Sequence, residues 1–213
     1  MPNFECVIFD CDGVLVDSEP LSNGMLVTMA NELGASIDLD FAYRNFKGHS
    51  LQHCLKVIST LIQDSLPRTF ENEYRERSYE IFKTEMTPIE GIEEVLQSLD
   101  KPFCVASSGP REKIRLNLKK TGLLPYFQNA IYSCYDIQKW KPDPGIFLHA
   151  AASMGFKVED CLVIEDSVAG VTAAKNGGFE VLAFTENDVL DELTTISNGT
   201  FGSMKELRSL LSV

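Results

Sequence analysis

Short apolar runs alternate with helix-like segments over most of this 213-residue sequence, and this alternation limits the possible folds more than any other feature. The runs lie at residues 4–9, 103–106, 130–134, 161–164 and 180–184. Short apolar strands that are separated by helices are typical of a parallel sheet covered on both faces. We therefore expect an α/β protein built on a doubly wound parallel sheet.

The stretch from residue 17 to residue 86 has a different pattern, because no strand-like run interrupts it. Apolar residues recur there at helical spacing in the three segments 21–33, 51–62 and 70–82. We expect residues 17–86 to form an all-helical domain, inserted into a larger α/β domain that consists of residues 1–16 and 87–213.

Two carboxylates, Asp10 and Asp12, directly follow the first apolar run. Alternation along an extended chain sends both side chains in the same direction. Like charges so close together are costly unless they share a cation or a proton. Gly13 comes next and allows the chain to turn, or another group to approach closely. These residues therefore indicate a cation site at the end of a buried strand.

Polar residues also follow the later strands. The candidates are Ser107, Ser108 and Gly109 after the second run, Glu165 and Asp166 after the fourth, and Lys141 between them. The carboxyl ends of parallel strands meet at one edge of a sheet, so we expect all these groups to lie around one point. Carboxylates, hydroxyls, an ammonium and helix N-termini suit a phosphoryl group with its Mg²⁺.

Each of these groups has a simpler structural explanation when it is considered alone. Ser107 is then best explained as a cap of the helix that starts near Pro110. Lys141 is explained as a solvated surface charge, and the pair Glu165 and Asp166 as an acidic first turn that complements a helix dipole. The coincidence of the four positions at one sheet edge favours a common site.

Charge and composition exclude several classes of function. The 31 acidic and 19 basic residues give a net charge of −12, and no basic stripe is present, so we expect no nucleic-acid partner. An anionic substrate requires local positive charge from a metal, a lysine or a helix N-terminus. No apolar run reaches about 18 residues, so no membrane contact is expected. Six cysteines without a CxxC pair, and a start unlike a signal peptide, predict a cytoplasmic protein, which we expect to be monomeric.

The series Asp10-x-Asp12-Gly13, Ser107, Lys141-Pro142 and Glu165-Asp166 resembles the haloacid dehalogenase superfamily of phosphohydrolases, over almost the whole chain. The chain is most similar to the subgroup with a helical cap after the first strand, which includes β-phosphoglucomutases and sugar-phosphate phosphatases. Residues 135–144, together with 46–48 in the cap, are similar to those of bacterial 6-phosphogluconate phosphatases. The resemblance implies a Rossmann-like core with an inserted all-helical cap domain.

The resemblance also implies roles for the carboxylates. Asp10 corresponds to the nucleophile that forms an aspartyl-phosphate, and Asp12 to the general acid and base. Asp10, the main-chain carbonyl of Asp12 and Asp166 are then ligands of Mg²⁺. Glu165 orients this shell through waters or hydrogen bonds.

The remaining core residues are implied to bind phosphate. Ser107 and Lys141 correspond to the groups that hold the phosphate oxygens during transfer, and Ser108 and Gly109 lie in the same loop. Ser108 stands where many relatives have Asn, which leaves its contact open.

Selectivity for the organic part of the substrate is implied to come from the cap, which closes over the site and excludes water. The two connections between the domains, near residues 15–17 and 86–88, are the hinge candidates. The cap residues that correspond to substrate contacts in the family are Glu19, Lys47, Gly48 and His49.

Two differences from the β-phosphoglucomutase pattern favour hydrolysis over phosphosugar mutase activity. β-Phosphoglucomutases carry a histidine where this chain has Ser22 and an arginine where it has Leu51. The expected function is therefore a Mg²⁺-dependent phosphatase that acts on a small sugar phosphate or sugar-acid phosphate, and a β-phosphoglucomutase-type mutase is the alternative. The expected partner is a small-molecule phosphomonoester.

Three other functions fit less well. A dehalogenase has no use for a general acid at Asp12. A signalling receiver domain carries its phosphorylated aspartate in mid-chain, has roughly 120 residues and lacks a helical insertion. A catalytically inactive binding protein is disfavoured because every core position of the family pattern is present.

Overall fold

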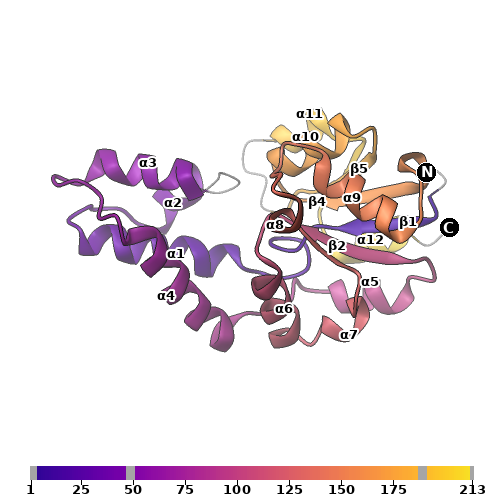
Figure 1. Ribbon diagram of the computed structural model, residues 1–213, viewed down its shortest axis with the longest axis horizontal. Helices are drawn as coiled ribbons and strands as arrows, with labels where there is room; N and C mark the ends of the chain where they lie inside the picture. Colours follow the sequence, from indigo (N-terminus) through magenta and orange to yellow (C-terminus); the bar gives the residue numbers. More distant parts are fainter. Residues whose placement is uncertain (1–3, 47–50, 187–190, 212–213) are drawn as a thin grey trace. The chain divides into compact units, whose positions relative to one another are not determined.

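The computed structural model describes residues 4–46, 51–186 and 191–211, and the chain divides into two compact units (Figure 1). One unit comprises Met1–Asp17 and Thr87–Val213, and the other comprises Ser18–Met86. Within the described ranges, no helix has the length and apolar character that crossing a membrane requires.

The larger unit contains one parallel sheet whose strands, in the described residues, follow the order β3-β2-β1-β4-β5-β6. The strands are β1 (Cys6–Phe9), β2 (Phe103–Ser107), β3 (Ile131–Ser133), β4 (Cys161–Glu165), β5 (Glu180–Phe184) and β6 (Gly199–Phe201). The chain adds β2 and β3 on one side of β1 and then β4, β5 and β6 on the other. The order therefore reverses at β1, which is where open α/β sheets place their sites.

The register of the three central strands aligns their carboxyl ends. Phe9 of β1 pairs with Val105 of β2 and with Ile164 of β4. The backbone N–H of Asp10 donates to the carbonyl of Ile164 at 2.9 Å, so the pairing continues one residue beyond β1. Residues that follow β1, β2 and β4 are consequently brought to one edge of the sheet, as the sequence pattern predicts.

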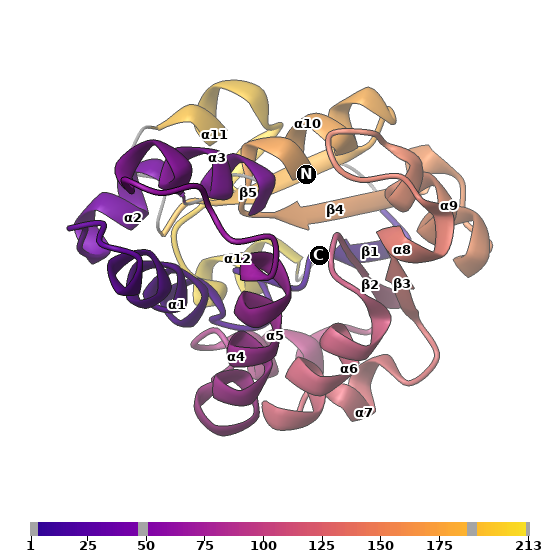
Figure 2. The same cartoon turned by 60° about the vertical axis from the view of Figure 1, so that its left-hand side comes forward.

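Helices cover both faces of the sheet (Figure 2). Those on one face are α9 (Gly145–Met154), α10 (Val168–Asn176) and α11 (Glu192–Ile196); those on the other are α5 (Ile92–Ser98), α6 (Arg111–Lys120), α7 (Leu124–Phe127) and α12 (Met204–Leu211). Side chains of β1 alternate between these two layers. Ile8 joins the apolar cluster of Phe147, whereas the ring of Phe9 contacts those of Phe103 and Phe127. This two-sided burial explains why β1 is apolar throughout.

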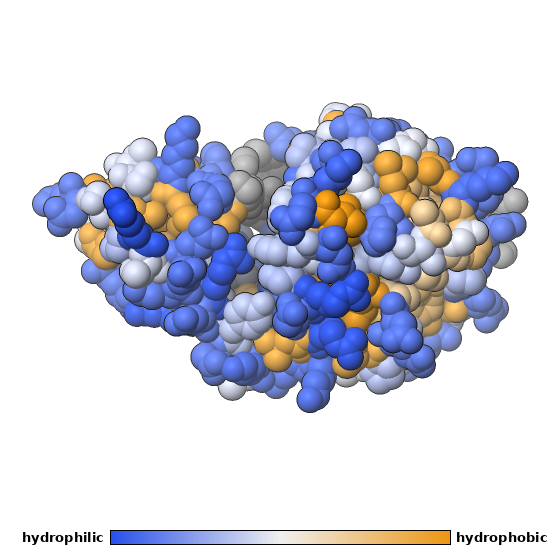
Figure 3. Space-filling view, viewed as in Figure 1, coloured by the Kyte–Doolittle hydropathy of each residue, from blue (hydrophilic) through white to orange (hydrophobic). Residues whose placement is uncertain are grey.

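The described part of the smaller unit is helical and has its own apolar core. Its helices are α1 (Glu19–Glu32), α2 (Leu39–Asn45), α3 (Leu51–Leu61) and α4 (Phe70–Glu85). The core is formed by Leu26, Met29, Ala30, Ala35, Ala42, Phe46, Cys54, Leu55, Ile58 and Phe70. Asp38 caps α2, because its carboxylate accepts a hydrogen bond from the N–H of Phe41 at 2.8 Å. The face in Figure 3 is largely hydrophilic, with apolar residues in limited patches.

The five predicted strands are present, and the differences from prediction concern short elements. Three-residue β6 and seven-residue α2 are too short to show a period. The predicted strand 130–134 ends at Ser133 because a capping box starts the short helix α8 (Cys134–Ile137) there. The hydroxyl of Ser133 accepts from the N–H of Tyr135 at 3.1 Å, and the carboxylate of Asp136 accepts from the N–H of Ser133 at 3.3 Å.

The two connections between the units run beside each other within the larger unit. The N–H of Asp17 donates to the carbonyl of Thr87 at 2.9 Å, and the N–H of Ile89 donates to the carbonyl of Leu15 at 3.1 Å. The hinge candidates of the sequence analysis therefore form a short hydrogen-bonded ladder.

Candidate active site

Asp10 lies at the carboxyl end of β1 and is buried, with 7% of its surface exposed. The ammonium of Lys141 donates to Asp10 Oδ1, to Glu165 Oε1 at 2.7 Å and to the carbonyl of Ala106 at 3.2 Å. Lys141 comes from the loop before α9, and its side chain is only 5% exposed. Asp10, Lys141 and Glu165, three of the sequence-predicted site residues, thus form one buried cluster. The peptide bond between Lys141 and Pro142 is cis.

Burial governs the electrostatics of this cluster. Burial raises the pKa of Asp10 to about 7; the Lys141 ammonium opposes the rise and the Glu165 carboxylate adds to it. Burial by itself lowers the pKa of Lys141, but the carboxylates of Asp10 and Glu165 outweigh it and raise that pKa above its ordinary value. Lys141 is therefore protonated at neutral pH. One ammonium between two carboxylates leaves a negative charge that favours a further cation or a proton.

Besides its contact with Lys141, Glu165 also holds the first turn of α10. Its Oε2 accepts hydrogen bonds at 2.9 Å from the N–H groups of Asp166 and Ser167 and from the Ser167 hydroxyl. The Ser167 hydroxyl in turn caps α10 by accepting from the N–H of Gly170 at 3.1 Å. A Cβ on Gly170 would lie 1.7 Å from Glu165 Oε1. Glycine is therefore required at this helical position so that Glu165 can reach Lys141.

Asp166 lies against the turn that follows β1. Gly13 has a φ of +87°, and a Cβ built on it would lie 2.0 Å from Asp166 Oδ2. The absent side chain of Gly13 leaves the space that the Asp166 carboxylate occupies. The main-chain carbonyl of Asp12 belongs to the same turn, so Asp166 and the residues after Asp10 share one small region.

Substitution of Gly13 by alanine is expected to displace Asp166 as well as to strain the backbone. A left-handed alanine costs roughly 1–2 kcal/mol. Gly122, with a φ of +78° and no heavy atom within 4 Å of a built Cβ, provides the matched control. We expect Gly13→Ala to lower the free energy of unfolding in urea by clearly more than Gly122→Ala. Equal losses in the two variants would mean that Asp166 does not depend on Gly13.

The loop after β2 is held by hydrogen bonds at both of its ends. The buried Ser107 hydroxyl accepts from the N–H of Gly109 at 3.0 Å. The Ser133 hydroxyl donates to the carbonyl of Gly109 at 2.6 Å, and the Cys134 thiol contacts Ser108 Oγ at 3.9 Å. The helix α6 starts after Pro110, which caps it with no side-chain hydrogen bond. Ser107 is therefore not the N-cap of that helix, but orders the loop that precedes it.

Asp12 pairs with a residue that the sequence pattern did not identify. The ammonium of Lys113, in the first turn of α6, donates to Asp12 Oδ1 at 3.0 Å and to Oδ2 at 2.9 Å. Side chains on a helix lean toward its N-terminus, so Lys113 extends back toward the site. Residues that the sequence reasoning missed therefore support the site, among them Lys113, Ser133 and Gly170. Only Gly170 carried a local signal, as a glycine inside a predicted helix.

The charges at this edge suit a divalent cation. The carboxyl groups of Asp10, Asp12, Glu165 and Asp166 outnumber the ammonium groups of Lys113 and Lys141 at this edge. Carboxylate and carbonyl oxygens are the ligands that Mg²⁺ prefers. Among the described residues, no three His, Cys, Asp or Glu side chains converge closely enough to hold a metal by themselves. A metal held here therefore needs a main-chain carbonyl and water in addition to carboxylates.

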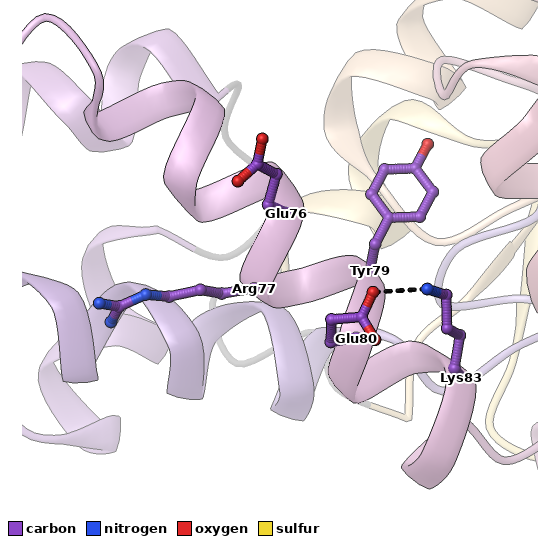
Figure 4. A pocket seen from close by; sticks show the side chains of 5 residues that line it. All are labelled: Glu76, Arg77, Tyr79, Glu80 and Lys83. Atoms are coloured by element: carbon purple, nitrogen blue, oxygen red, sulfur yellow. Dashed lines mark hydrogen bonds and ion pairs between the residues drawn. The ribbon is translucent and has the colours of Figure 1, made fainter.

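The candidate cap residues belong to the helical unit. Glu19 is the first residue of α1 in the helical unit and is partly buried. Lys47, Gly48 and His49 lie outside the described residues. A hollow of about 500 Å³ on α4 is lined by Glu76, Arg77, Tyr79, Glu80 and Lys83, with Glu80 and Lys83 forming an ion pair (Figure 4). None of the candidate site residues lines it.

Comparisons with known proteins identify relatives of this chain in sequence and in fold. The family described as haloacid dehalogenase-like hydrolase matches residues 4–178. The 6-phosphogluconate phosphatase of Escherichia coli is 39% identical over 185 residues, which cover 86% of this chain and 84% of that protein. A haloacid dehalogenase-like protein from Agrobacterium tumefaciens superposes with a TM-score of 0.91 at 29% identity, covering 99% of this chain and 98% of that one. A haloacid dehalogenase family hydrolase from Deinococcus radiodurans, solved with bound phosphate and sodium, has a TM-score of 0.84 at 28% identity and covers 100% of this chain and 96% of that one.

Proposed function

The chain belongs to the haloacid dehalogenase-like hydrolases, and from this premise we propose that it is a Mg²⁺-dependent phosphatase of small sugar phosphates or sugar-acid phosphates. As a member of this family it is a phosphoric monoester hydrolase. One observation supports the proposal most strongly: a buried carboxylate, Asp10, lies beside the ammonium of Lys141 at the edge where the strand order reverses. Such a carboxylate can attack phosphorus while the ammonium neutralises the phosphoryl oxygens.

In the first step, a carboxylate oxygen of Asp10 forms a bond to phosphorus, and the bond from phosphorus to the leaving oxygen breaks. The leaving oxygen takes the proton of Asp12, so the alcohol departs neutral and Asp12 becomes ionised. Lys141 and the loop Ser107–Gly109 bind the phosphoryl oxygens. The product is an aspartyl-phosphate on Asp10.

In the second step, Asp12 accepts a proton from a water molecule as the water oxygen attacks phosphorus. The bond between phosphorus and Asp10 breaks, and the carboxylate of Asp10 is regenerated together with inorganic phosphate. The same side chain thus donates a proton in one step and accepts one in the next.

A metal fits the donor set of the site. Asp10, Asp166 and the carbonyl of Asp12 are the residues that would hold Mg²⁺, and the bound ion would neutralise charge on the phosphoryl group. The space at Gly13 that Asp166 occupies, and the excess of carboxyl groups over ammonium groups at this edge, support this assignment. Glu165 positions Lys141 and the first turn of α10 in this scheme. Six buried free thiols suit a reducing compartment such as the cytoplasm.

The name of the relative in Escherichia coli supports the proposed substrate class. That relative is a 6-phosphogluconate phosphatase, whose name points to a sugar-acid phosphate. We assign selectivity for the organic part to residues 18–86, with Glu19 as a candidate. Leu51, where β-phosphoglucomutases have arginine, packs against the apolar core of the helical unit. An apolar residue that serves the core favours hydrolysis over mutase activity.

A panel of phosphomonoesters tests the proposal. We expect release of inorganic phosphate from at least one of 6-phosphogluconate, hexose 6-phosphates and phosphoglycolate, with kcat/KM above 10⁴ M⁻¹s⁻¹ in order of magnitude. β-Glucose 1-phosphate is included because conversion to an isomer without phosphate release would identify a mutase. Absence of phosphate release from every member in the presence of Mg²⁺ would contradict the proposal.

Removal of the metal with EDTA is expected to abolish activity, and Mg²⁺ is expected to restore it. The affinity for Mg²⁺ should also depend on pH, because burial raises the pKa of Asp10 to about 7 and a protonated carboxylate is a poor ligand. The affinity therefore falls as the pH drops below 7, by about tenfold between pH 8 and pH 6. Calorimetric titration with Mg²⁺ at the two pH values measures this change. The Asp10→Asn variant serves as the control and should bind weakly at both; a wild-type affinity that is independent of pH would contradict the assignment of Asp10 as a ligand.

A further inference from the structure

The first turn of α6 contributes an ammonium group to the site in addition to that of Lys141. Lys113 donates to both carboxylate oxygens of Asp12, at 3.0 and 2.9 Å. The side chains of Lys113 and Asp12 are 21% and 29% exposed, so the pair is partly shielded from water. A two-pronged contact restrains the orientation of the carboxylate plane more than a single hydrogen bond does.

The stem of Lys113 lies along the loop that follows β2. A Cβ built on Gly109 would lie 3.4 Å from Lys113 Cδ, 3.5 Å from Ser107 Oγ and 3.9 Å from Asp12 Oδ2. A single point on this loop is thus within 4 Å of all three side chains. Lys113 therefore links the loop of Ser107 to Asp12, although Lys113 and Asp12 are 101 positions apart in the sequence.

The two ammonium groups at the site have different partners. Lys141 contacts Asp10, Glu165 and the carbonyl of Ala106, all at the ends of strands. Lys113 contacts Asp12 from a helix. Lys141 is therefore placed to bind the phosphoryl group that Asp10 attacks in the proposed mechanism. Lys113 instead contacts Asp12, the proposed general acid and base.

We propose that Lys113 is a positioning residue that holds the ionised Asp12 carboxylate in the rotamer from which it takes up a proton and, once protonated, donates it to the leaving oxygen. The inference rests on the proposed function of Asp12. Lys113 neither gives nor takes the proton in this scheme: the proton moves from Asp12 to the leaving oxygen and later from water to Asp12. The contribution of Lys113 is to orient the donor before the reaction starts.

The test uses two leaving groups. An alkoxide needs a proton as it departs, whereas p-nitrophenolate is a stable anion and leaves without one. We expect Lys113→Met to lower kcat by about 10- to 100-fold for the alkyl phosphomonoester of the panel with the highest kcat/KM, since general acid catalysis contributes about 10²–10⁴. For p-nitrophenyl phosphate we expect a change of less than about threefold. Affinity for inorganic vanadate should stay close to that of the wild type.

Two further variants control for charge and structure. Lys113→Arg retains a two-pronged donor and should recover most of the lost kcat with the alkyl substrate. Lys119→Met removes an exposed lysine from the same helix and should leave both substrates unaffected. Equal losses with both leaving groups, or a loss mainly in KM and vanadate affinity, would overturn the proposal and identify Lys113 as a phosphate contact.

Asp12→Asn separates failure of this inference from failure of the proposed function. If Asp12→Asn loses activity selectively with the alkyl substrate and Lys113→Met does not, the role of Asp12 stands and the positioning role of Lys113 is wrong. If Asp12→Asn shows no selectivity for the leaving group, Asp12 is not the general acid and both proposals fail.

Discussion

Substitution of Asp10 by asparagine is expected to reduce turnover to below about 1% of the wild-type rate. The amide cannot form the bond to phosphorus that a carboxylate oxygen forms, and it is a poorer metal ligand. The variant should nevertheless fold. Because burial raises the pKa of Asp10 from 3.8 to about 7, the ionised carboxylate is disfavoured in the folded state, and the contribution of Asp10 to stability falls as the pH rises from the unfolded pKa to the folded one. At pH 8, Asp10→Asn should therefore unfold at a urea concentration no lower than that of the wild type.

Steady-state phosphate release and urea unfolding, measured on the same preparations, test this expectation. Asp100→Asn removes an exposed carboxylate in the same unit and should change neither quantity. Asp10→Ala is included because asparagine can deamidate back to aspartate. Residual activity above about 1% in both Asp10 variants would rule out Asp10 as the nucleophile.

Substitution of Lys141 by methionine is expected to affect both stability and activity. Methionine preserves much of the side-chain volume beside the Phe147 ring, which lies 4.8 Å from the ammonium. It leaves the carboxylates of Asp10 and Glu165 buried without their shared cation. Breaking a buried ion pair from one side costs roughly 3–5 kcal/mol. Loss of the charge that we propose to face the phosphoryl group is expected to lower kcat by a factor on the order of 10²–10³.

Urea unfolding, kcat and vanadate affinity together test the role of Lys141. The double variant Asp10→Asn/Lys141→Met should regain part of the lost stability, because it buries one carboxylate fewer. Lys157→Met removes an exposed lysine, 78% exposed, and serves as the control. Unchanged stability of Lys141→Met would show that water or a metal ion compensates the two carboxylates. Unchanged vanadate affinity would exclude Lys141 as a phosphate ligand.

Much of the architecture could be read from local patterns. Apolar runs such as Cys161–Ile164 and the helical spacing of apolar residues between 51 and 62 report the period of the backbone, and a period of two or 3.6 residues is a local property. The prediction that strand ends share one edge also holds, because parallel strands leave few other arrangements. Elements such as β6 and α2 were missed because three to seven residues do not complete enough periods to be distinguished from loops.

The candidate site also contains residues that the sequence indicates and residues that only the structure shows. Asp10 and Asp166 stand out in the sequence because carboxylates directly after apolar strands are costly without a partner. Lys113 does not stand out, because a lysine in a polar helix resembles any solvated charge. Its contact with Asp12 depends on how α6 packs beside the sheet, and no local pattern encodes that packing.

The order of residues along the chain was sufficient to establish the parallel sheet, the helical insertion and the carboxylates at the strand ends, since each depends on neighbouring residues. The pairing of each lysine with its carboxylates depends on the tertiary structure. Lys141 meets Asp10 and Glu165, and Lys113 meets Asp12, because strand order and helix packing bring together side chains that are 24 to 131 positions apart. Charge pairing acts through space, and distance in space is set by the tertiary fold.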